Sequence, residues 1–173
     1  MRQCCYISAV TSPDCSGDPT LHSSMRPLRE LLAEMDSDIA RLYAARGVSG
    51  VRPRFSMALI RLYHRGPMTV RELAEQIDVT HSAMSQTITA MRAEGLVETA
   101  PGRDARTRDV TLTEWGRDLV PFLEEEWRAT ERAVAELEAE LPYPLTRVVE
   151  DMKAALERRS FLDRITAQME QRP

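Results

Sequence analysis

Apolar residues recur at helical spacing along most of this chain. In the first third, an apolar stripe runs from about Pro27 to Arg46, and the run Gly47-Val48-Ser49-Gly50 ends it. A second, shorter helix is expected to begin at Pro53 and to stop at Gly66-Pro67. The stripe of the first helix consists of Leu28, Leu31, Leu32, Met35, Ile39, Leu42 and Tyr43.

The same helical period returns near the end of the chain. Thr113 is suited to cap a helix of roughly 40 Å, and Pro142-Tyr143-Pro144 breaks the chain after it. One last helix is expected beyond this break. The stripe of the long helix contains Trp115, Leu119, Leu123, Trp127, Val134, Leu137 and Leu141. The stripe of the last helix contains Leu145, Val149, Met152, Leu156, Leu162, Ile165 and Met169.

Between these flanks, residues 69–93 predict a helix-turn-helix. Thr69 followed by Glu72 forms a capping box, which places a helix start at about Val70. Asp78-Val79 makes a tight turn, and Thr80 is a good N-cap for the second helix. The buried face of that second helix is expected to consist of Met84, Ile88 and Met91.

The outward face of the second helix lacks the Glu and Lys residues that usually keep a helix surface in water. It carries small hydroxyls and one amide, from Ser82, Ser85, Gln86 and Thr89. A Gln side chain can bond adenine in a bidentate way, Ser and Thr can serve several bases, and small side chains let a helix lie deep in a major groove. An ordinary polar helix face is the alternative, and the segment that follows favours DNA reading.

A β-hairpin with a basic tip is expected directly after this helix pair. Gly95 ends the second helix, and residues 96–100 and 108–112 have the pattern of two short strands that pair with each other. Arginines on such a tip suit a minor groove, whose narrow walls concentrate negative potential. Solvated turn charges are the alternative, which the preceding helix pair disfavours. The arginines of the tip and its exit are Arg103, Arg106 and Arg108.

The order of these motifs resembles the MarR family of bacterial transcription regulators. The resemblance implies that the helix from His81 onward is the recognition helix, that Arg106 enters the minor groove and that Asp104 helps to hold the wing. Gln86 departs from the family, in which Arg is common at this position. The match is close over the middle third of the chain and extends to the flanks in architecture only. The matching residues are Gly95-Leu96-Val97, Asp104-Ala105-Arg106 and Leu112-Thr113-Glu114-Trp115-Gly116, with Val79-Thr80 and Ser82-Ala83 before them.

The expected fold class is mainly α (α+β): a winged helix-turn-helix with a small β-hairpin wing and N- and C-terminal dimerisation helices. The flanking helices carry more apolar face than the small head can cover, so we expect a homodimer that places two recognition helices about one turn apart on double-stranded DNA. Mutual burial of these helices within a monomer is the alternative. The expected domains are a tail (1–24), an N-terminal dimerisation helix and linker (25–52), the DNA-binding domain (53–116) and the C-terminal dimerisation helices (117–173).

The first 24 residues lack a helical period and are rich in Ser, Pro, Gly and Asp, so a disordered tail is expected. Met25 is an alternative start of the protein. The apolar stretch from Ile7 to Val10 is too short for a secretory signal, which predicts a cytoplasmic protein with reduced thiols. A redox role for Cys15, as in one branch of the MarR family, is the alternative to a plain tail. All three cysteines lie in this tail, at Cys4, Cys5 and Cys15.

Charge and composition narrow the function classes. The 173 residues carry a formal net charge of −4, and no apolar run is long enough to span a membrane. Residues 54–114 hold eight Arg and eight acidic residues, and the acidic excess follows them; this distribution is compatible with DNA binding without arguing for it. His22, His64 and His81 lie in different elements and the cysteines lack zinc-ligand spacing, so no metal, cofactor or enzymatic activity is expected.

Two function classes remain. The first is a ligand-responsive transcription regulator, a repressor that reads a pseudo-palindromic operator. The second is a winged-helix interaction module without a specific operator or effector. The MarR family often binds small aromatic or phenolic anions between the dimer helices and the winged head. Residues that could line such a pocket are Tyr43, Arg46, Phe55, Tyr63, His64 and Trp115. The spacing of the aromatic residues in this set is equally that of core residues. Arg46 or His64 could form an ion pair with the anion.

Overall fold

The computed structural model describes residues 18–102 and 108–171. The described residues form two compact units, which meet in the sequence between Pro53 and Arg54. In the first unit, the 3-10 turn η1 (Pro19–Leu21) precedes helix α1 (Arg26–Ala45). The Asp18 carboxylate accepts a hydrogen bond of 2.8 Å from the backbone N–H of Thr20 and thereby caps η1. The part of the expected disordered tail that is described therefore contains a capped turn, and residues 1–17 with their cysteines lie outside the described residues.

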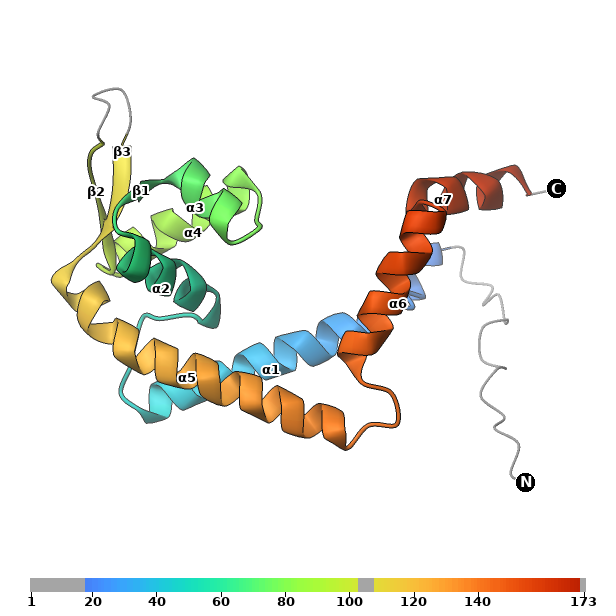
Figure 1. Cartoon of the computed structure of the whole chain (residues 1–173), viewed down its shortest axis with the longest axis horizontal. Helices are drawn as coiled ribbons and strands as arrows, with labels where there is room; N and C mark the ends of the chain where they lie inside the picture. Colours follow the sequence, from blue (N-terminus) through green and yellow to red (C-terminus); the bar gives the residue numbers. More distant parts are fainter. Residues whose placement is uncertain (1–17, 103–107, 172–173) are drawn as a thin grey trace. The chain divides into compact units, whose positions relative to one another are not determined.

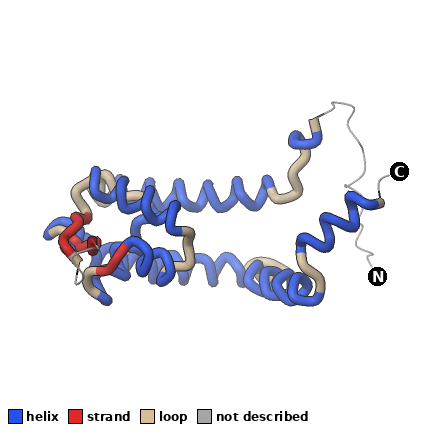
Figure 2. The backbone as a smooth tube through the Cα atoms, turned by 90° about the horizontal axis from the view of Figure 1, so that it is seen from above, coloured by secondary structure: helices blue, strands red, loops and turns tan. Residues whose placement is uncertain are grey.

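The second unit holds the helix-turn-helix, the strands and the long C-terminal helices (Figure 1). Helices α2, α3 and α4 gather beside three antiparallel strands, which are short compared with the helices around them (Figure 2). The 3-10 turn η2 (Pro53–Phe55) leads into the second unit. The elements that follow are α2 (Ser56–Arg65), β1 (Met68–Thr69), α3 (Val70–Gln76), α4 (His81–Ala93), β2 (Val97–Pro101), β3 (Arg108–Leu112), α5 (Glu114–Ala139), α6 (Leu145–Arg158) and α7 (Phe161–Glu170).

The predicted start signals of the helix-turn-helix are confirmed. Thr69 caps α3 in a reciprocal capping box, because its hydroxyl accepts from the N–H of Glu72 at 3.2 Å and the Glu72 carboxylate accepts from the N–H of Thr69 at 2.7 Å. The Thr80 hydroxyl accepts from the N–H of Ala83 at 3.2 Å and caps α4. Between the helices, Asp78 takes a left-handed conformation with φ of 55°, which makes the turn tight.

The sheet has one strand more than the sequence predicted. Strands β2 and β3 form the expected hairpin, with Val97 opposite Leu112 and Pro101 opposite Arg108. The unpredicted strand β1 pairs with the other edge of β3, which gives the order β1-β3-β2. A strand of two residues is too short to show the alternation by which strands are recognised in a sequence.

The core of the second unit lies where α2, α3, α4 and α5 meet the inner face of the hairpin. The apolar stripes expected for these helices supply it, and both strands of the hairpin contribute inward residues. The buried apolar residues include Phe55, Leu59, Leu62, Leu73, Met84, Ile88, Met91, Leu96, Val97, Val110, Leu112, Leu119, Val120 and Leu123. The recognition-type helix is therefore held by its buried face, and its polar face is left exposed.

The base of the wing is joined to the start of α5 by Thr113. Its hydroxyl donates to the carbonyl oxygens of Gly95 at 2.7 Å and Leu96 at 3.2 Å, and it accepts from the N–H of Gly116 at 3.0 Å. Gly95 ends α4 with φ of 70°, as its left-handed role requires. Gly116 is buried so close to Leu96 that an added Cβ would overlap the Leu96 carbonyl oxygen. We call these four residues the wing base.

The expectation of one last helix is wrong, because the structure has two. Arg159 takes an extended conformation with φ of −154° and ψ of 118°, which ends α6. The Ser160 hydroxyl then accepts from the N–H of Asp163 at 3.1 Å and caps α7. Arg164 of α7 donates to the carbonyl oxygen of Ala155 at 3.0 Å, which satisfies the end of α6. The boundary expected between residues 116 and 117 falls inside α5, which is continuous.

Candidate nucleic-acid interface

The outward face of α4 is the first part of the candidate interface. The five residues predicted to contact DNA from this helix are all exposed, whereas Met84, Ile88 and Met91 on the opposite side are buried. The helix has no Asp, Glu, Lys or Arg before Arg92. The exposed set is His81, Ser82, Ser85, Gln86 and Thr89. The buried stripe thus turns a face of small polar groups outward, in the arrangement that a major groove accepts.

The hydroxyls and the amide on this face differ in the hydrogen bonds that they already make. The Thr89 hydroxyl donates to the carbonyl oxygen of Ser85 at 2.9 Å within the helix. The side chains of Ser82, Ser85 and Gln86 make no hydrogen bond to any other residue of the described ranges 18–102 and 108–171. Their donors and acceptors are available to a ligand, because they are exposed and not engaged.

The wing is the second part, and its described portion consists of the two strands. Arg103, Asp104 and Arg106 lie outside the described residues, so their roles stay predictions. Arg108 is exposed on β3, and its guanidinium donates across the hairpin to the carbonyl oxygen of Thr99 at 3.4 Å. Arg108 therefore has a place at the described end of the hairpin, fixed against the neighbouring strand.

Strand β1 joins the two parts of the interface. Met68 and Thr69 pair with Val110 and Asp109 of the wing, and Thr69 is also the N-cap of α3. The helix-turn-helix and the wing consequently share one sheet and one capping residue. Sequence reasoning assigned Thr69 only its capping role, because nothing in the sequence shows that the two residues pair with the wing.

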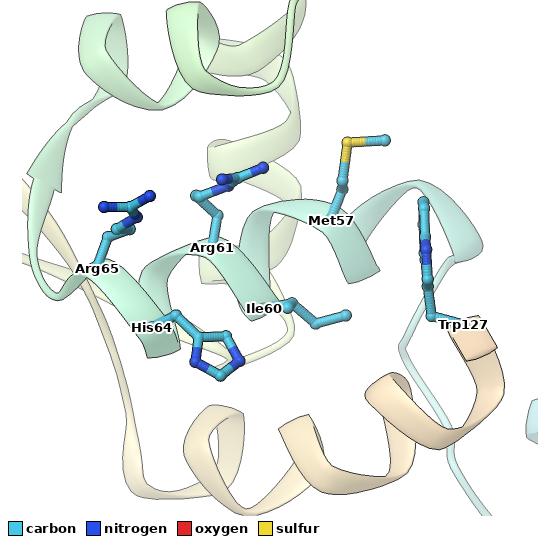
Figure 3. Close-up of a pocket in the computed structure, with 6 residues that line it drawn as sticks. All are labelled: Met57, Ile60, Arg61, His64, Arg65 and Trp127. Atoms are coloured by element: carbon cyan, nitrogen blue, oxygen red, sulfur yellow. The ribbon is translucent and has the colours of Figure 1, made fainter.

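A cavity of about 450 Å³ is lined by five residues of α2 and one of α5 (Figure 3). Arg61 and Arg65 extend to the same side of α2, and His64 points toward α5. The apolar part of its wall includes Trp127, which α5 contributes from the long stripe. The lining residues are Met57, Ile60, Arg61, His64, Arg65 and Trp127.

Of the six residues expected in an effector pocket, His64 lines this cavity. Phe55 is fully buried in the core, at 0% exposure. Tyr63 and Trp115 are exposed and do not line the cavity. Tyr43 and Arg46 belong to the first compact unit. The sequence did not lead us to Arg61, Arg65 and Trp127, although it contains a signal for each of them. Arg61 and Arg65 are four residues apart and therefore share one helix face. Trp127 belongs to the same apolar stripe as Trp115.

The comparisons with known proteins agree with this geometry. Residues 49–107 match a sequence model described as the MarR family, and this segment runs from before η2 through the helix-turn-helix into the wing. The segment is a MarR-family domain.

Solved structures with the MarR fold align with most of the chain. A MepR–DNA complex from Staphylococcus aureus is 19% identical, covers 79% of this chain and 95% of its own, and has a TM-score of 0.56. The MosR regulator of Mycobacterium tuberculosis in complex with DNA is 24% identical, covers 80% and 99%, and scores 0.54. A SlyA-like regulator from Listeria monocytogenes is 13% identical, covers 88% and 99%, and scores 0.55. At these identities the likeness shows the fold. No curated protein sequence matches the chain.

Beside this cavity, an ion cluster links α2 to α5. His64 Nε2 lies 2.5 Å from Glu124 Oε1, and Arg128 donates to the other oxygen of Glu124 at 3.0 Å. The hydrogen bond with His64 and, next, the hydrogen bond with Arg128 hold the pKa of Glu124 below its ordinary value of 4.5. His64 thus both lines the cavity and contacts α5, which contributes Trp127 to the lining.

We expect His64→Ala to raise the pKa of Glu124 back toward 4.5, because its largest cause of lowering is removed. A lowered folded pKa stabilises the fold above the unfolded value and loses that contribution as the pH falls through the folded value. At pH values below about 4.5, the wild type should therefore unfold at a lower pH than the His64→Ala variant does. Titration of Glu124 by NMR and unfolding at decreasing pH measure both effects.

Arg128→Ala is the matched control, since it removes the second contact and should shift the pKa of Glu124 less than His64→Ala does. A pKa of Glu124 that is the same in the wild type and in His64→Ala would contradict the assigned contact.

Two further observations on the described residues complete the site. They contain no cluster of three or more His, Cys, Asp or Glu side chains arranged to hold a metal ion. No helix in the same part of the chain has the length and apolar character needed to cross a membrane.

Proposed function

We propose that this protein is a transcription regulator that binds a specific DNA site as a homodimer. The observation that carries the proposal is the uncharged, exposed and largely unengaged polar face of α4 on a MarR-family winged helix. In this proposal α4 enters the major groove, and the wing reaches the adjacent minor groove. The MepR and MosR structures, each described as a complex with DNA, support DNA as the partner.

The proposed contacts divide by groove. His81, Ser82, Ser85, Gln86 and Thr89 of α4 meet base edges and the phosphates beside them, because they form the exposed face. Arg103, Arg106 and Arg108 act through charge at the minor groove, with Asp104 holding the wing. Of these wing residues, Arg108 is supported by its place on β3. The others rest on the sequence.

Homodimerisation is supported by the exposed apolar residues of α6 and α7. Both helices keep an apolar stripe exposed, and within the described residues none of their side chains is buried. A second copy of the chain can cover this surface and place a second α4 on the next half-site. The exposed apolar residues are Leu145, Val148, Val149, Met152, Leu156, Phe161, Leu162, Ile165 and Met169.

Competition binding tests the proposal against an interaction module without an operator. Duplexes selected from a random pool by the pure protein should outcompete random duplex by roughly 1000-fold or more at physiological salt. Equal competition by selected and random duplexes would reject a specific operator and leave the interaction module. The genes beside matching genomic sites are then the candidate targets, and their transcript levels with and without the protein would separate repression from activation.

We further propose that the cavity lined by α2 and α5 binds a small aromatic anion that alters DNA binding. Its volume of about 450 Å³ is within the range of ligand pockets. Arg61 and Arg65 supply positive charge on one side, and Met57, Ile60 and Trp127 supply apolar surface. A planar ring with one carboxylate or phenolate matches this combination.

With benzoate as the probe, binding should change the fluorescence of Trp127. We expect Arg61→Ala or Arg65→Ala to weaken benzoate binding about tenfold, since each removes a charge-assisted hydrogen bond. Arg71→Ala is the matched control, because Arg71 is an exposed arginine on α3 that pairs with Glu75 and does not line the cavity. If Trp127→Phe keeps the full fluorescence change, the signal comes from Trp115 and the cavity is not the site.

A further inference from the structure

The outward face of α4 restricts which base pairs it can recognise. Residues 81–91 contain no Lys or Arg, and the first such residue is Arg92 at the end of the helix. The N-terminal part of a recognition helix contacts base edges, and Arg92 lies about 9 Å along the axis beyond Gln86. The part of α4 that can reach bases therefore has no side chain with a guanidinium or ammonium group.

Guanine is the base that this face is least equipped to bind. Its major-groove edge presents two acceptors, N7 and O6, and is bound best by Arg or Lys, which supply two donors. The His81 ring and the hydroxyls of Ser82 and Ser85 can each donate one hydrogen bond to one of those acceptors. A single donor of this kind does not make the bidentate contact by which Arg binds guanine.

Adenine and thymine, by contrast, match what α4 exposes. The Gln86 amide has an NH2 group that can donate to N7 of adenine and a carbonyl oxygen that can accept from N6, and no residue of the described ranges engages that amide. The Thr89 hydroxyl has already donated its hydrogen to Ser85, so Thr89 has a methyl group and an oxygen lone pair left to offer. Ala83 offers a methyl group.

These three residues also share one row. Ala83, Gln86 and Thr89 follow one another at intervals of three, are all exposed, and so lie along one face of α4. Methyl groups of Ala and Thr are suited to contact the C5-methyl group of thymine. The row therefore consists of a thymine-type contact, an adenine-type contact and a second thymine-type contact.

We propose that α4 reads A·T base pairs at the centre of each half-site, with Gln86 on an adenine and the methyl groups of Ala83 and Thr89 against thymines. The inference rests on the proposed function and adds the base identity. Because residues 81–91 contain no Arg or Lys, this face lacks the bidentate contact by which guanine is bound best.

The first test changes the amide. Duplexes are selected with the pure protein, and each selected A·T pair is then replaced by G·C. The wild type should lose roughly 5- to 150-fold in affinity at the pair facing residue 86. Gln86→Arg should invert that ratio in favour of G·C at the same pair. Gln86→Ala is the matched control, which should bring the ratio close to one without inverting it.

The second test changes the DNA and leaves the wild-type protein intact. Replacing a thymine by uracil removes the C5-methyl group alone, so the pair facing Thr89 should bind several-fold more weakly when it contains uracil. Thr89→Ser deletes the methyl group of the protein and retains the hydroxyl that bonds Ser85. This variant should bind the thymine and uracil duplexes equally.

The outcomes separate the inference from the proposed function. Selection of half-sites with G·C at their centre, with an unchanged ratio in Gln86→Arg, overturns the inference and leaves the regulator intact. Uracil that is tolerated at every selected thymine overturns the methyl contacts. If no sequence is selected at all, both the proposed function and the inference fail. Circular dichroism of each variant shows that it is folded before its affinity is compared.

Discussion

The Gly116→Ala variant should be unfolded or lose at least about 3 kcal/mol of its free energy of unfolding, although it adds a single methyl group. That methyl group would overlap the backbone carbonyl oxygen of Leu96. The carbonyl cannot move aside cheaply, because it accepts hydrogen bonds from the N–H and the hydroxyl of Thr113. Replacing a helical Gly by Ala usually stabilises by about 1 kcal/mol, so at this position the steric cost should outweigh the gain in helix propensity.

Urea denaturation followed by circular dichroism measures the loss. Leu96→Ala is the control background: it removes the side chain and leaves the backbone carbonyl in place, so Gly116→Ala should destabilise Leu96→Ala as much as it destabilises the wild type. A midpoint for Gly116→Ala equal to that of the wild type, with an unchanged slope, would show that the wing base can open and that this packing is not required.

The second large effect concerns assembly. We expect Leu156→Glu combined with Ile165→Glu to turn the proposed dimer into a monomer at micromolar concentration. The two side chains are 40% and 42% exposed in the single chain and lie in the apolar stripes of α6 and α7. Burying two carboxylates without partners would cost more than an interface of this kind recovers. Size-exclusion chromatography with light scattering measures the mass directly.

A control introduces two glutamates at polar positions of the same helices, and it changes the net charge by −3 against −2 for the test variant. Lys153→Glu combined with Thr166→Glu should leave the dimer intact, because both residues are exposed and lie outside the apolar stripes. A dimer that survives Leu156→Glu with Ile165→Glu, but not the control, would place the interface on the polar faces. The monomer should keep the far-ultraviolet spectrum of a folded chain, since the core of the winged helix does not include either residue.

Local signals predicted the second unit well where short-range chemistry decides the structure. The capping box at Thr69 and the N-caps Thr80 and Thr113 fix where three helices begin, and each is made by residues within three positions of one another. The buried stripe of α4 then fixes which face is exposed, so the polar face followed from the sequence. These features need no knowledge of distant contacts.

The features that the sequence could not predict depend on contacts between distant elements. Strand β1 exists because two residues meet β3 some 40 positions later in the chain. The end of α6 depends on Arg159 leaving helical geometry, while the apolar stripe continues into α7 with almost the same period. The cavity is lined by Trp127 and not by Trp115. The sequence could not predict this choice, because periodicity places both tryptophans on one stripe and only the packing of α2 on α5 distinguishes them.

Helix α5 has a mechanical property that follows from its one proline. Thr113 fixes its first turn to the wing base, and Trp127 and Glu124 form part of the cavity region about 20 Å along the same helix. Pro121 lies between these two places and has no N–H to donate to the turn before it. We therefore expect α5 to bend most easily at Pro121, between the wing base and the cavity. A change of the helix angle at Pro121 would therefore move the wing base relative to the cavity.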